Sequence, residues 1–449
     1  MKNSKRFVAI IVMLAMMLTF TAGAMAEEKT LHFYAWTNPA NMEPLLEAFN
    51  KDYEGQYEMV YEKLADATTL SINTALSSGE PIEVMTQASA MDLRVRVDDG
   101  IYLPLNQYFE KEGWTYEDVM GESIAETMNI NGDYYAIPYC TNINMVWFNK
   151  KMFDAAGVEY PKEGWTWEDF RQTAIALTSG EGENKVYGAM MDICGSGSGS
   201  GDNYWNLIAR QKLGAFTYYN DDRTATSFDK PEMKESLEFF YKLMMEDKCV
   251  VPYAEYKALQ YVNDTTGMAG LYNGKYAMFV APVYACLYLK PSYGEVPEGT
   301  DLGLADMPTV DGGPCVTTCY TSTASIPASA PDPDAAWEAI KYITITRADL
   351  FAGPKSMHPG YALKTAEEKE AFNSIIFSGK PGLDYDMAME VMGRDRTLVS
   401  NDTTIRAGQV EINDIIDNTL TLVFNGEMSV DDALAKMKSE GDTAILLSD

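Results

Sequence analysis

The chain has 449 residues and a formal net charge of −31 at pH 7, with 66 acidic against 35 basic side chains. A surface with so large an acidic excess repels nucleic acid and anionic lipid, so both are excluded as partners. The length is too great for one compact core and predicts two domains, and the hydrophobic content of 46% provides enough apolar side chains to fill both interiors.

The N-terminal segment 1–26 has the pattern of a secretory signal peptide. Basic residues are followed by an uncharged run at 7–20 and by the small-residue site AMA at 24–26. That run is too short to cross a bilayer comfortably, and small residues of this kind mark a cleavage site. No cysteine precedes Cys140, so none is present near the cleavage point to carry a lipid anchor. The sequence therefore predicts an exported protein whose mature chain begins near Glu27, without a lipid anchor, in the periplasm or outside the cell.

Behind this leader, strands and helices are expected to alternate. Strand-forming residues occupy 31–36, 57–61 and 82–86, and apolar residues at helical spacing occupy 41–51 and 66–78. Short connections between them predict a parallel, doubly wound α/β sheet. Ligands of such sheets bind beyond the carboxyl ends of the strands, which here carry Trp36, Asn38, Gln87 and Ser89.

The segment 132–149, GDYYAIPYCTNINMVWFN, is rich in aromatic and β-favouring residues. A turn signal at its start and the position of Pro138 predict two strands joined at the proline. Asn142 and Asn144 follow this joint. Trp147 shares the strand alternation of Met145 and Asn149 and is expected in the core.

Further helices and one flexible connection are expected downstream. Residues 151–157 predict a short helix closed by glycine, Thr166 begins another helix, and Ser429 begins the last one. The run GSGSGSG at 195–201 lacks the ending of a phosphate-binding loop, so we interpret it as a flexible connection. Asp202 and Trp205 follow this run, and two interpretations of them stay open. The segment could be a mobile lid that carries the tryptophan, or the tryptophan could begin a helix of the core.

Histidine and cysteine usage predicts no metal and no cofactor. The chain has only two histidines, and its six cysteines lie far apart except for Cys315 and Cys319. Zinc and haem sites need clustered ligands of these types. An exported chain could form disulfides, but a fold of this size does not need them, so we expect mostly free, buried thiols. The pair Cys315 and Cys319 is the one for which a bridge stays open.

A series of motifs then carries a resemblance. GDYYAIP at 132–138 is followed by WFNK at 147–150, FDAAG at 153–157 and TWEDF at 166–170, and later by YNGKYAM (272–278), WEAIKYI (337–343) and SVDDAL (429–434). In this order the motifs resemble the extracellular solute-binding proteins of family 1, the carbohydrate receptors of ABC importers, of which maltose-binding protein is a distant relative. The resemblance spans nearly the whole mature chain. Relatives commonly carry Gly-Pro-Trp where this chain has Ala281-Pro-Val-Tyr284, so Tyr284 is expected to take the place of the tryptophan.

The resemblance implies a two-lobed periplasmic-binding-protein fold in which strands cross between the lobes and the substrate lies in the cleft. It implies an N-terminal lobe of residues 27–137 with 283–326, and a C-terminal lobe of residues 138–282 with 327–449. A crossing segment must stay extended, and proline favours this because it cannot continue a helix. The expected hinge residues are Ile137, Pro138, Pro282, Ile326 and Pro327.

The same resemblance implies a monomeric binding protein, not an enzyme, that closes around a sugar or oligosaccharide and delivers it to an ABC transporter permease. Binding a sugar requires flat aromatic faces and many hydrogen-bonding groups, with little net charge. The candidate ligand-binding residues are Trp36, Asn38, Gln87, Ser89, Asn142, Asn144, Asp202, Trp205, Tyr284 and Tyr320.

Other functions stay open at this point. The same fold could bind a phosphate ester, a polyamine or iron, although the strand ends supply no arginine or lysine for an anion. Tyr284 and Tyr320 leave iron open. An exported carbohydrate-active hydrolase is the alternative enzyme, but the acidic excess makes any carboxylate pair uninformative, and neither Gly-x-Ser-x-Gly nor His-Glu-x-x-His occurs. A structural surface protein would be expected to have repeats and an anchoring tail, and this sequence shows neither.

Overall fold

The computed structural model describes residues 28–36, 39, 42–65, 69–87, 93–194, 204–214, 217–259, 264–290, 294–347, 350, 366–400 and 408–448. The predicted signal peptide lies outside the described residues, as do three of the candidate site residues: Asn38, Ser89 and Asp202. Within the described part of the chain, no helix is long and apolar enough to cross a membrane.

The first half of the molecule is built on the parallel sheet that the alternating pattern predicted. Its bounds are β1 (Lys29–Ala35), α2 (Glu43–Asp52), β2 (Tyr57–Lys63), α3 (Thr69–Leu76) and β3 (Val84–Gln87). β1 lies between the other two strands, and Phe33 faces both Tyr61 and Val84 in the register. α2 buries Leu45 and Phe49 on its inner face. The expected alternation of strands and helices is confirmed, with small differences at the ends.

Helices cover this sheet, and one of them comes from much later in the chain. The helices that follow β3 are α4 (Leu93–Asp98), α5 (Asn106–Glu112), α6 (Tyr116–Met120) and α7 (Glu122–Met128). α14 (Pro333–Lys341) contacts β1 and β3, and the π-helical turn η7 (Tyr342–Thr346) continues it. Lys341 Nζ donates to Glu112 Oε1 at 2.6 Å, which ties α14 to α5. The lobe boundaries implied by the resemblance put residues 327–449 in the C-terminal lobe, whereas α14 packs in the first half.

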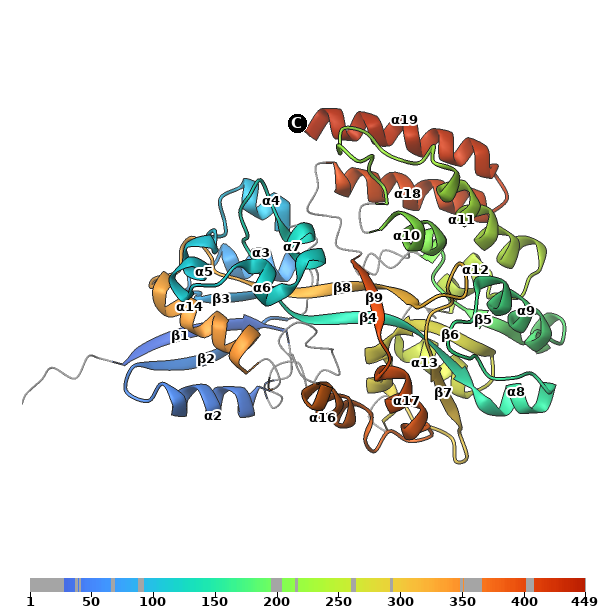
Figure 1. Ribbon diagram of the computed structural model, residues 1–449, viewed down its shortest axis with the longest axis horizontal. Helices are drawn as coiled ribbons and strands as arrows, with labels where there is room; N and C mark the ends of the chain where they lie inside the picture. Colours follow the sequence, from blue (N-terminus) through green and yellow to red (C-terminus); the bar gives the residue numbers. More distant parts are fainter. Residues whose placement is uncertain are drawn as a thin grey trace, which may run out of the picture.

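β4 (Ile137–Asn149) is one continuous strand that crosses the molecule, so the prediction of two strands joined at Pro138 is wrong. The pairing register shifts between Pro138 and Cys140, and this irregularity accommodates a residue that has no N–H to donate. The first part of β4 pairs with β8 (Cys315–Ser325), and the second part pairs with β6 (Tyr276–Pro282) and β7 (Leu302–Ala305), all antiparallel. The strand order β2-β1-β3-β8-β4-β6-β5 therefore runs through both halves, with β4 and β8 connecting them (Figure 1).

The expected hinge residues lie at the ends of the crossing strands. Ile137 and Pro138 begin β4 and face Ala324 and Thr323 of β8. The other expected hinge residues are Pro282, which ends β6 opposite Asn144, and Ile326 and Pro327, which directly follow β8. All of them therefore lie beside the only two strands that pair with partners from both halves in the described part of the sheet.

The second half surrounds the far end of β4. Thr166 forms the expected helix start, as a capping box in which its Oγ1 accepts from the Asp169 N–H at 3.1 Å. Ser429 Oγ likewise accepts from the Asp432 N–H at 3.1 Å. β7 pairs with β4 here, although the implied boundaries put 283–326 in the N-terminal lobe.

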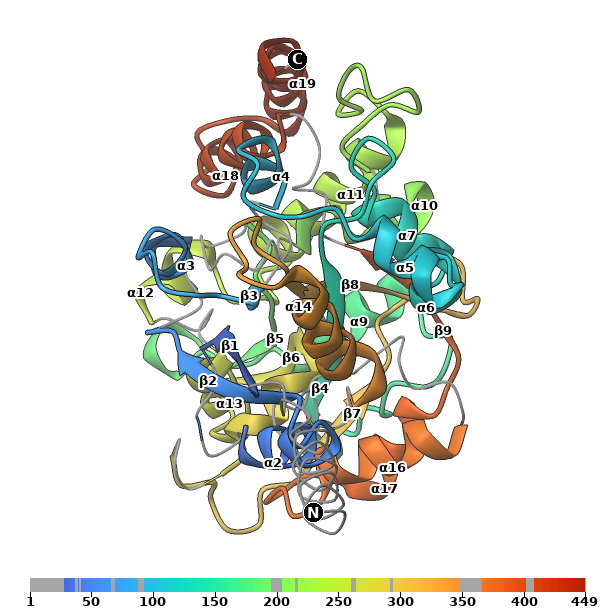
Figure 2. The same cartoon turned by 90° about the vertical axis from the view of Figure 1, so that its left-hand side faces the viewer.

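Figure 2 shows α4 and α18 on one side of the molecule and α7 and β9 on the other. The remaining elements belong mainly to the second half. They are α8 (Lys150–Ala156), α9 (Trp167–Leu177), η2 (Gly182–Asn184), β5 (Tyr187–Met190), η3 (Tyr204–Asn206), α10 (Leu207–Leu213), α11 (Pro231–Tyr241), η4 (Lys242–Glu246), α12 (Tyr253–Ala258), α13 (Asp264–Tyr272), η5 (Val283–Tyr288), α16 (Ala366–Phe377), α17 (Tyr385–Met392), β9 (Arg396–Ser400), α18 (Gln409–Phe424) and α19 (Val430–Ser448).

The core contains the residues that the sequence assigned to it. Trp147 is fully buried, and its Nε1 donates to the carbonyl of Pro282 at 3.4 Å. The cysteines whose side chains are described are buried and form no disulfide with one another, which confirms the expectation of mostly unbridged, buried thiols for Cys194, Cys249, Cys286, Cys315 and Cys319. Burial raises the pKa of Cys249 and of Cys315 to about 12, so both thiols stay protonated at neutral pH.

Candidate functional site

Asn142 and Asn144 lie at the middle of β4, where its pairing changes from β8 to β6. Residues two apart on a strand project from the same face, so both asparagines share one face and Ile143 lies on the other. Both side chains are fully buried. In the register Asn142 faces Tyr320 of β8, whose backbone is described but whose side chain is not. The two asparagines are therefore the centre of the polar region between the two halves.

Asn144 is held by side chains from both neighbouring segments. Its Nδ2 donates to Thr318 Oγ1 of β8 at 2.8 Å, and its Oδ1 accepts from the Tyr204 hydroxyl of η3 at 3.1 Å. The Thr317 hydroxyl donates to the Asn144 carbonyl at 2.6 Å. These contacts fix the rotamer of Asn144 and give its amide partners within the protein.

Asn142 differs from Asn144 in that neither its Oδ1 nor its Nδ2 has a hydrogen-bond partner among the described residues. Leaving a buried amide donor or acceptor unpaired costs about 1–3 kcal/mol for each group. Buried polar groups are nearly always paired, so such an exception requires an explanation. The Asn142 amide is positioned to exchange hydrogen bonds with a polar group that reaches the middle of β4.

Tyr204 is the site residue that sequence reasoning missed. η3 holds it in place, because its N–H donates to the Asp192 carbonyl at 2.9 Å, and the Asp192 carboxylate in turn accepts from the Tyr256 hydroxyl at 3.1 Å. Burial raises the pKa of Tyr256 above its usual value, so this hydroxyl remains a donor. The segment around 202–205 did point to this region, but only the contact with Asn144 distinguishes Tyr204 from its neighbour.

Trp205 lies in the hydrophobic core. It is fully buried, and its ring packs against the rings of Tyr218 and Phe228, with centroid distances of 6.2 and 6.4 Å. Of the two interpretations left open by the sequence, the structure therefore matches a tryptophan that opens a core helix. Trp205 is not brought together with Asn142 and Asn144.

Gln87 belongs to a polar network at the carboxyl end of β3. Its Nε2 donates to Ser325 Oγ at 3.3 Å and to Thr323 Oγ1 at 3.4 Å, and its Oε1 accepts from Arg96 Nη1 at 2.5 Å. The Arg96 guanidinium also donates to Asn73 Oδ1 from Nε at 3.2 Å and from Nη2 at 3.1 Å. This network ties β3, β8, α3 and α4 together, and it uses both ends of the Gln87 amide.

Arg96 places a buried cation near the strand ends, where the sequence indicated none. It comes from α4, outside the segments that end the strands, and only folding brings it back to Gln87. Its contacts with Gln87 and Asn73 show that it has a structural role in the described part of the chain.

The remaining candidates lie at the edges of this region. Trp36 directly follows β1 and is partly buried against the core. Tyr284 lies in η5, two residues beyond Pro282, which pairs with Asn144, and it is half-buried. The structure thus brings together Asn142, Asn144, Tyr284 and the backbone of Tyr320.

The groups at the middle of β4 are amides and hydroxyls. Among the described residues, no cluster of three or more His, Cys, Asp or Glu side chains could hold a metal ion. Amides and hydroxyls can both donate and accept hydrogen bonds, which suits a neutral ligand with many hydroxyls more than a highly charged one.

Comparisons with solved structures identify the fold. A sugar transporter from Rhizobium etli in an open conformation is 22% identical, with a TM-score of 0.70, and covers 93% of this chain and 99% of its own. An ABC substrate-binding protein from Listeria monocytogenes in complex with cycloalternan is 16% identical, with a TM-score of 0.69, covering 93% and 98% of the two chains. The sugar-binding protein MalE from Xanthomonas citri gives the same identity, TM-score and coverage. The chain therefore has the two-lobed α/β fold of periplasmic binding proteins.

The sequence gives the family. No curated protein sequence matches the chain significantly. A family model described as bacterial extracellular solute-binding protein matches residues 35–348, which is well over half of the chain and includes β2, β3, the crossing strands β4 and β8, and α14. This match agrees with the order of the motifs between GDYYAIP and WEAIKYI and with the crossing strands seen in the structure. The chain belongs to the family of bacterial extracellular solute-binding proteins.

Proposed function

We propose that this protein binds a sugar or oligosaccharide in the cleft between its lobes and delivers it, by hinge closure, to the membrane permease of an ABC importer. Membership in the solute-binding family supports the general function. The sugar class is supported by structural relatives that hold tagatose, maltose and maltotetraose. In this proposal the protein is exported by its leader and acts as a monomeric binding protein, without catalysis, cofactor or lipid anchor.

The observation that carries the proposal is the buried amide of Asn142, which has no hydrogen-bond partner in the described part of the chain. An amide offers one accepting oxygen beside one donating nitrogen. Two neighbouring hydroxyls of a sugar ring match this pair, because one hydroxyl donates to Oδ1 while the other accepts from Nδ2. A phosphate ester presents mainly hydrogen-bond acceptors. Its anionic oxygens would lie against Oδ1, which is itself an acceptor with a partial negative charge. The amide of Asn142 therefore favours a neutral polyol over an anion.

We assign the lobes from the packing. The first lobe comprises β1 to β3 with α2 to α7 and the returning α14 and η7; the second comprises β5 to β7 with η5 and most of the C-terminal helices. In this assignment the chain exchanges lobes within β4 and within β8. Bending at the irregular register near Pro138 would let the lobes rotate while the strands stay paired.

Thermal unfolding against a ligand panel tests the proposal. Mature protein would be heated with maltose, maltotetraose, cycloalternan and tagatose, and with a polyamine, a phosphate ester and ferric iron as contrasts. A ligand at about one hundred times its dissociation constant adds about 2.7 kcal/mol of stability, which raises the melting midpoint measurably. We expect a shift from sugars only. A shift confined to the phosphate ester or to iron would overturn the sugar assignment, and turnover of an oligosaccharide would overturn the non-enzymatic function.

Hinge closure is tested separately by small-angle scattering. We expect the radius of gyration to fall when a sugar that stabilises the protein is added, because a ligand that contacts both lobes favours the closed arrangement. An unchanged radius with a bound sugar would contradict closure while leaving the binding assignment in place.

A further inference from the structure

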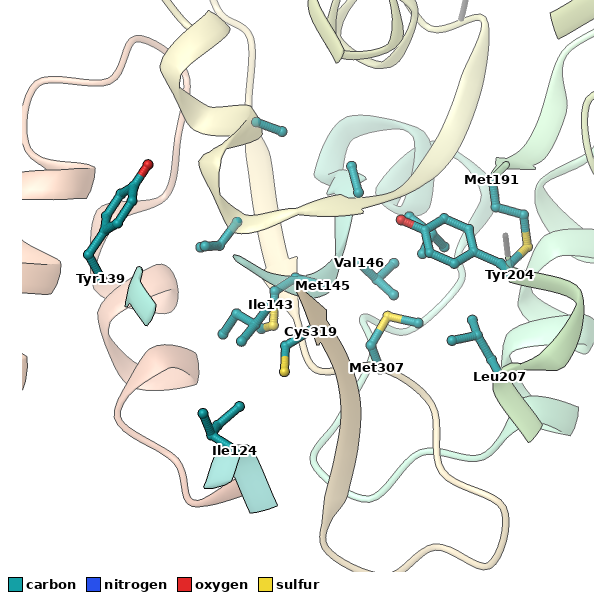
Figure 3. Close-up of a cluster of buried hydrophobic side chains, with 14 of the residues drawn as sticks. Ile124, Tyr139, Ile143, Met145, Val146, Met191, Tyr204, Leu207, Met307 and Cys319 are labelled. Atoms are coloured by element: carbon teal, nitrogen blue, oxygen red, sulfur yellow. The ribbon is translucent and has the colours of Figure 1, made fainter. Parts of the chain in front are cut away.

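The crossing strands have two faces, and a different part of the molecule lies on each. Asn142 and Asn144 project from the face that Tyr204 contacts. Ile143, Met145 and Cys319 project from the opposite face. Figure 3 shows Ile124 of α7 on the side of the strands where Cys319 lies, whereas Tyr204 lies on the other side. α7 also contacts β9, which pairs with β8. α7 therefore lies behind the crossing strands, on the side away from the candidate site.

Behind the strands, an ion pair joins the two halves directly. Arg223 Nη2 donates to Glu126 Oε1 at 3.0 Å. Glu126 lies on α7, whose buried residues and contact with α6 place it in the first half. Arg223 lies in the second half, at the tip of the hairpin closed by the pairing of Tyr219 with Thr226. The contact therefore links the halves without using the crossing strands.

The hairpin presents Arg223 rigidly. Thr226 donates from both its N–H and its Oγ1 to Asp442 Oδ1 of α19, at 2.7 Å each. At the tip, Asn220 Oδ1 accepts from the Thr224 N–H at 2.9 Å. Arg223 itself has a positive φ of 60°, which the tight turn requires. Movement of the second half must carry Arg223 with it.

Closing a cleft in front of a hinge moves groups behind the hinge apart, as in any hinge-bending protein. We propose that the ion pair between Glu126 and Arg223 is a latch that stabilises the open arrangement and so lowers the affinity for ligand. This inference rests on the proposed hinge closure. Ligand binding must then break the pair, and the apparent dissociation constant rises with the fraction of molecules held open.

The expected size of the effect follows from the exposure of the pair. The Arg223 and Glu126 side chains are 38% and 62% exposed, so water and salt screen their attraction. Exposed ion pairs of this kind change an equilibrium constant by about two- to fivefold. The latch is therefore a modest adjustment of affinity, and it weakens as salt concentration rises.

The first test needs no ligand. The radius of gyration of unliganded Arg223→Gln and Glu126→Gln is expected to be smaller than that of the wild type at low salt, and the difference is expected to vanish at high salt. The charge-swapped variant E126R/R223E is expected to return to the wild-type value, which separates loss of the pair from loss of other contacts. Wild-type radii in both single variants, or a swapped variant that behaves like the single ones, would overturn the latch.

The second test measures affinity for whichever of maltose, maltotetraose, cycloalternan and tagatose binds the wild type. Each single variant is expected to bind that sugar about two- to fivefold more tightly, with the swapped variant restored. Asp221→Asn is the matched control, because Asp221 pairs with Lys230 at 3.7 Å within the same half, and its affinity is expected to stay at the wild-type value. Equal affinities in all variants, with sugar-induced compaction intact, would overturn the latch alone. Absence of any compaction in the wild type would instead overturn hinge closure.

Discussion

At the scale of single residues, the contrast between Asn142 and Asn144 is the most informative feature. Both are buried on the same face of β4, yet only Asn144 has partners among the described side chains. A buried amide with partners stabilises the fold, while a buried amide without them reduces stability and is available for binding. The two residues should therefore respond in opposite ways to the same substitution.

Asn142→Ala is expected to leave the free energy of unfolding unchanged or to increase it, because it removes unpaired polar atoms. The same change is expected to weaken sugar binding at least tenfold, about 1.4 kcal/mol. Asn144→Ala is the matched variant and is expected to destabilise the protein by about 1–3 kcal/mol, since it removes the acceptor of the Tyr204 hydroxyl and the donor to Thr318 Oγ1. Urea unfolding and calorimetric titration measure the two quantities. A destabilised Asn142→Ala with wild-type affinity would contradict both expectations.

Glu83 gives a pH dependence with a definite sign. It is buried directly before β3, and burial raises its pKa although its carboxylate accepts from the His32 N–H at 2.5 Å. The pKa of Glu83 is therefore higher in the folded protein than in the unfolded chain. Its contribution to the free energy of unfolding is fully present at low pH, where Glu83 is protonated, and is lost as pH rises through the pKa of the folded state.

Glu83→Gln removes this titration. We expect the variant to gain stability relative to the wild type as pH rises from about 4 to 7, as measured by urea unfolding across that range. Glu80→Gln, an exposed change in the preceding turn, should show no such trend. A constant difference between Glu83→Gln and wild type at all pH values would argue against a raised pKa.

At the scale of elements, the helix starts behave as their local sequences indicate. In the capping box of α9, Thr166 Oγ1 accepts from the Asp169 N–H, and Asp169 Oδ2 accepts from the Thr166 N–H at 2.8 Å. These hydrogen bonds lower the pKa of Asp169. Such signals are readable from sequence because the interacting groups are three residues apart.

Thr166→Ala is expected to cost about 1 kcal/mol of stability, because α9 loses its N-terminal cap. Thr166→Ser keeps the hydroxyl and should cost much less. Because the Asp169 pKa is lowered in the folded state, its contribution is present above the unfolded pKa and disappears as pH falls, so the penalty of Thr166→Ala should shrink in acid. A penalty that is the same for both variants would indicate that packing, not capping, is responsible.

A buried ion-pair cluster holds β9 and the end of α17 against the second half. Asp306 is 3% exposed, and its Oδ2 pairs with Arg394 Nη1 at 2.9 Å while its Oδ1 pairs with Arg396 Nη2 at 3.1 Å. Removing one partner of a buried pair leaves uncompensated charge, which typically costs about 3–5 kcal/mol.

Asp306→Asn is therefore expected to destabilise the protein by an amount of that order and to speed amide exchange in β9. Glu390→Gln is the matched control, since Glu390 also pairs with Arg394, at 2.7 Å, but is 72% exposed. Its loss should change stability by less than about 1 kcal/mol. Equal effects of the two variants would show that burial of the pair is unimportant.

At the scale of the whole molecule, β4 and β8 are the strands that join the halves, and the candidate site lies at their middle. A ligand that bridges both halves should slow amide exchange at the carboxyl ends of β1 and β3 and also in η3 and η5. Hydrogen exchange with and without a bound sugar measures this. Protection confined to one half would contradict a site between the lobes.

The sequence by itself determined the α/β class, the helix starts, the core position of Trp147, the motif order and hence the family. These depend on periodicity and on groups a few residues apart, which any segment carries locally. It also pointed to Asn142 and Asn144, because they follow the proline of a crossing segment.

Only the tertiary structure decided which candidates meet. Tyr204 reaches Asn144 and Trp205 enters the core, Arg96 returns to Gln87, and α14 packs on the first half. Each of these contacts joins residues brought together by strand register and by the path of β4 and β8. A change of one residue in register would exchange the faces of the crossing strand and with them Asn142 and Ile143. Local patterns carry no record of that register, and this is why the residues that meet at the candidate site had to come from the folded chain.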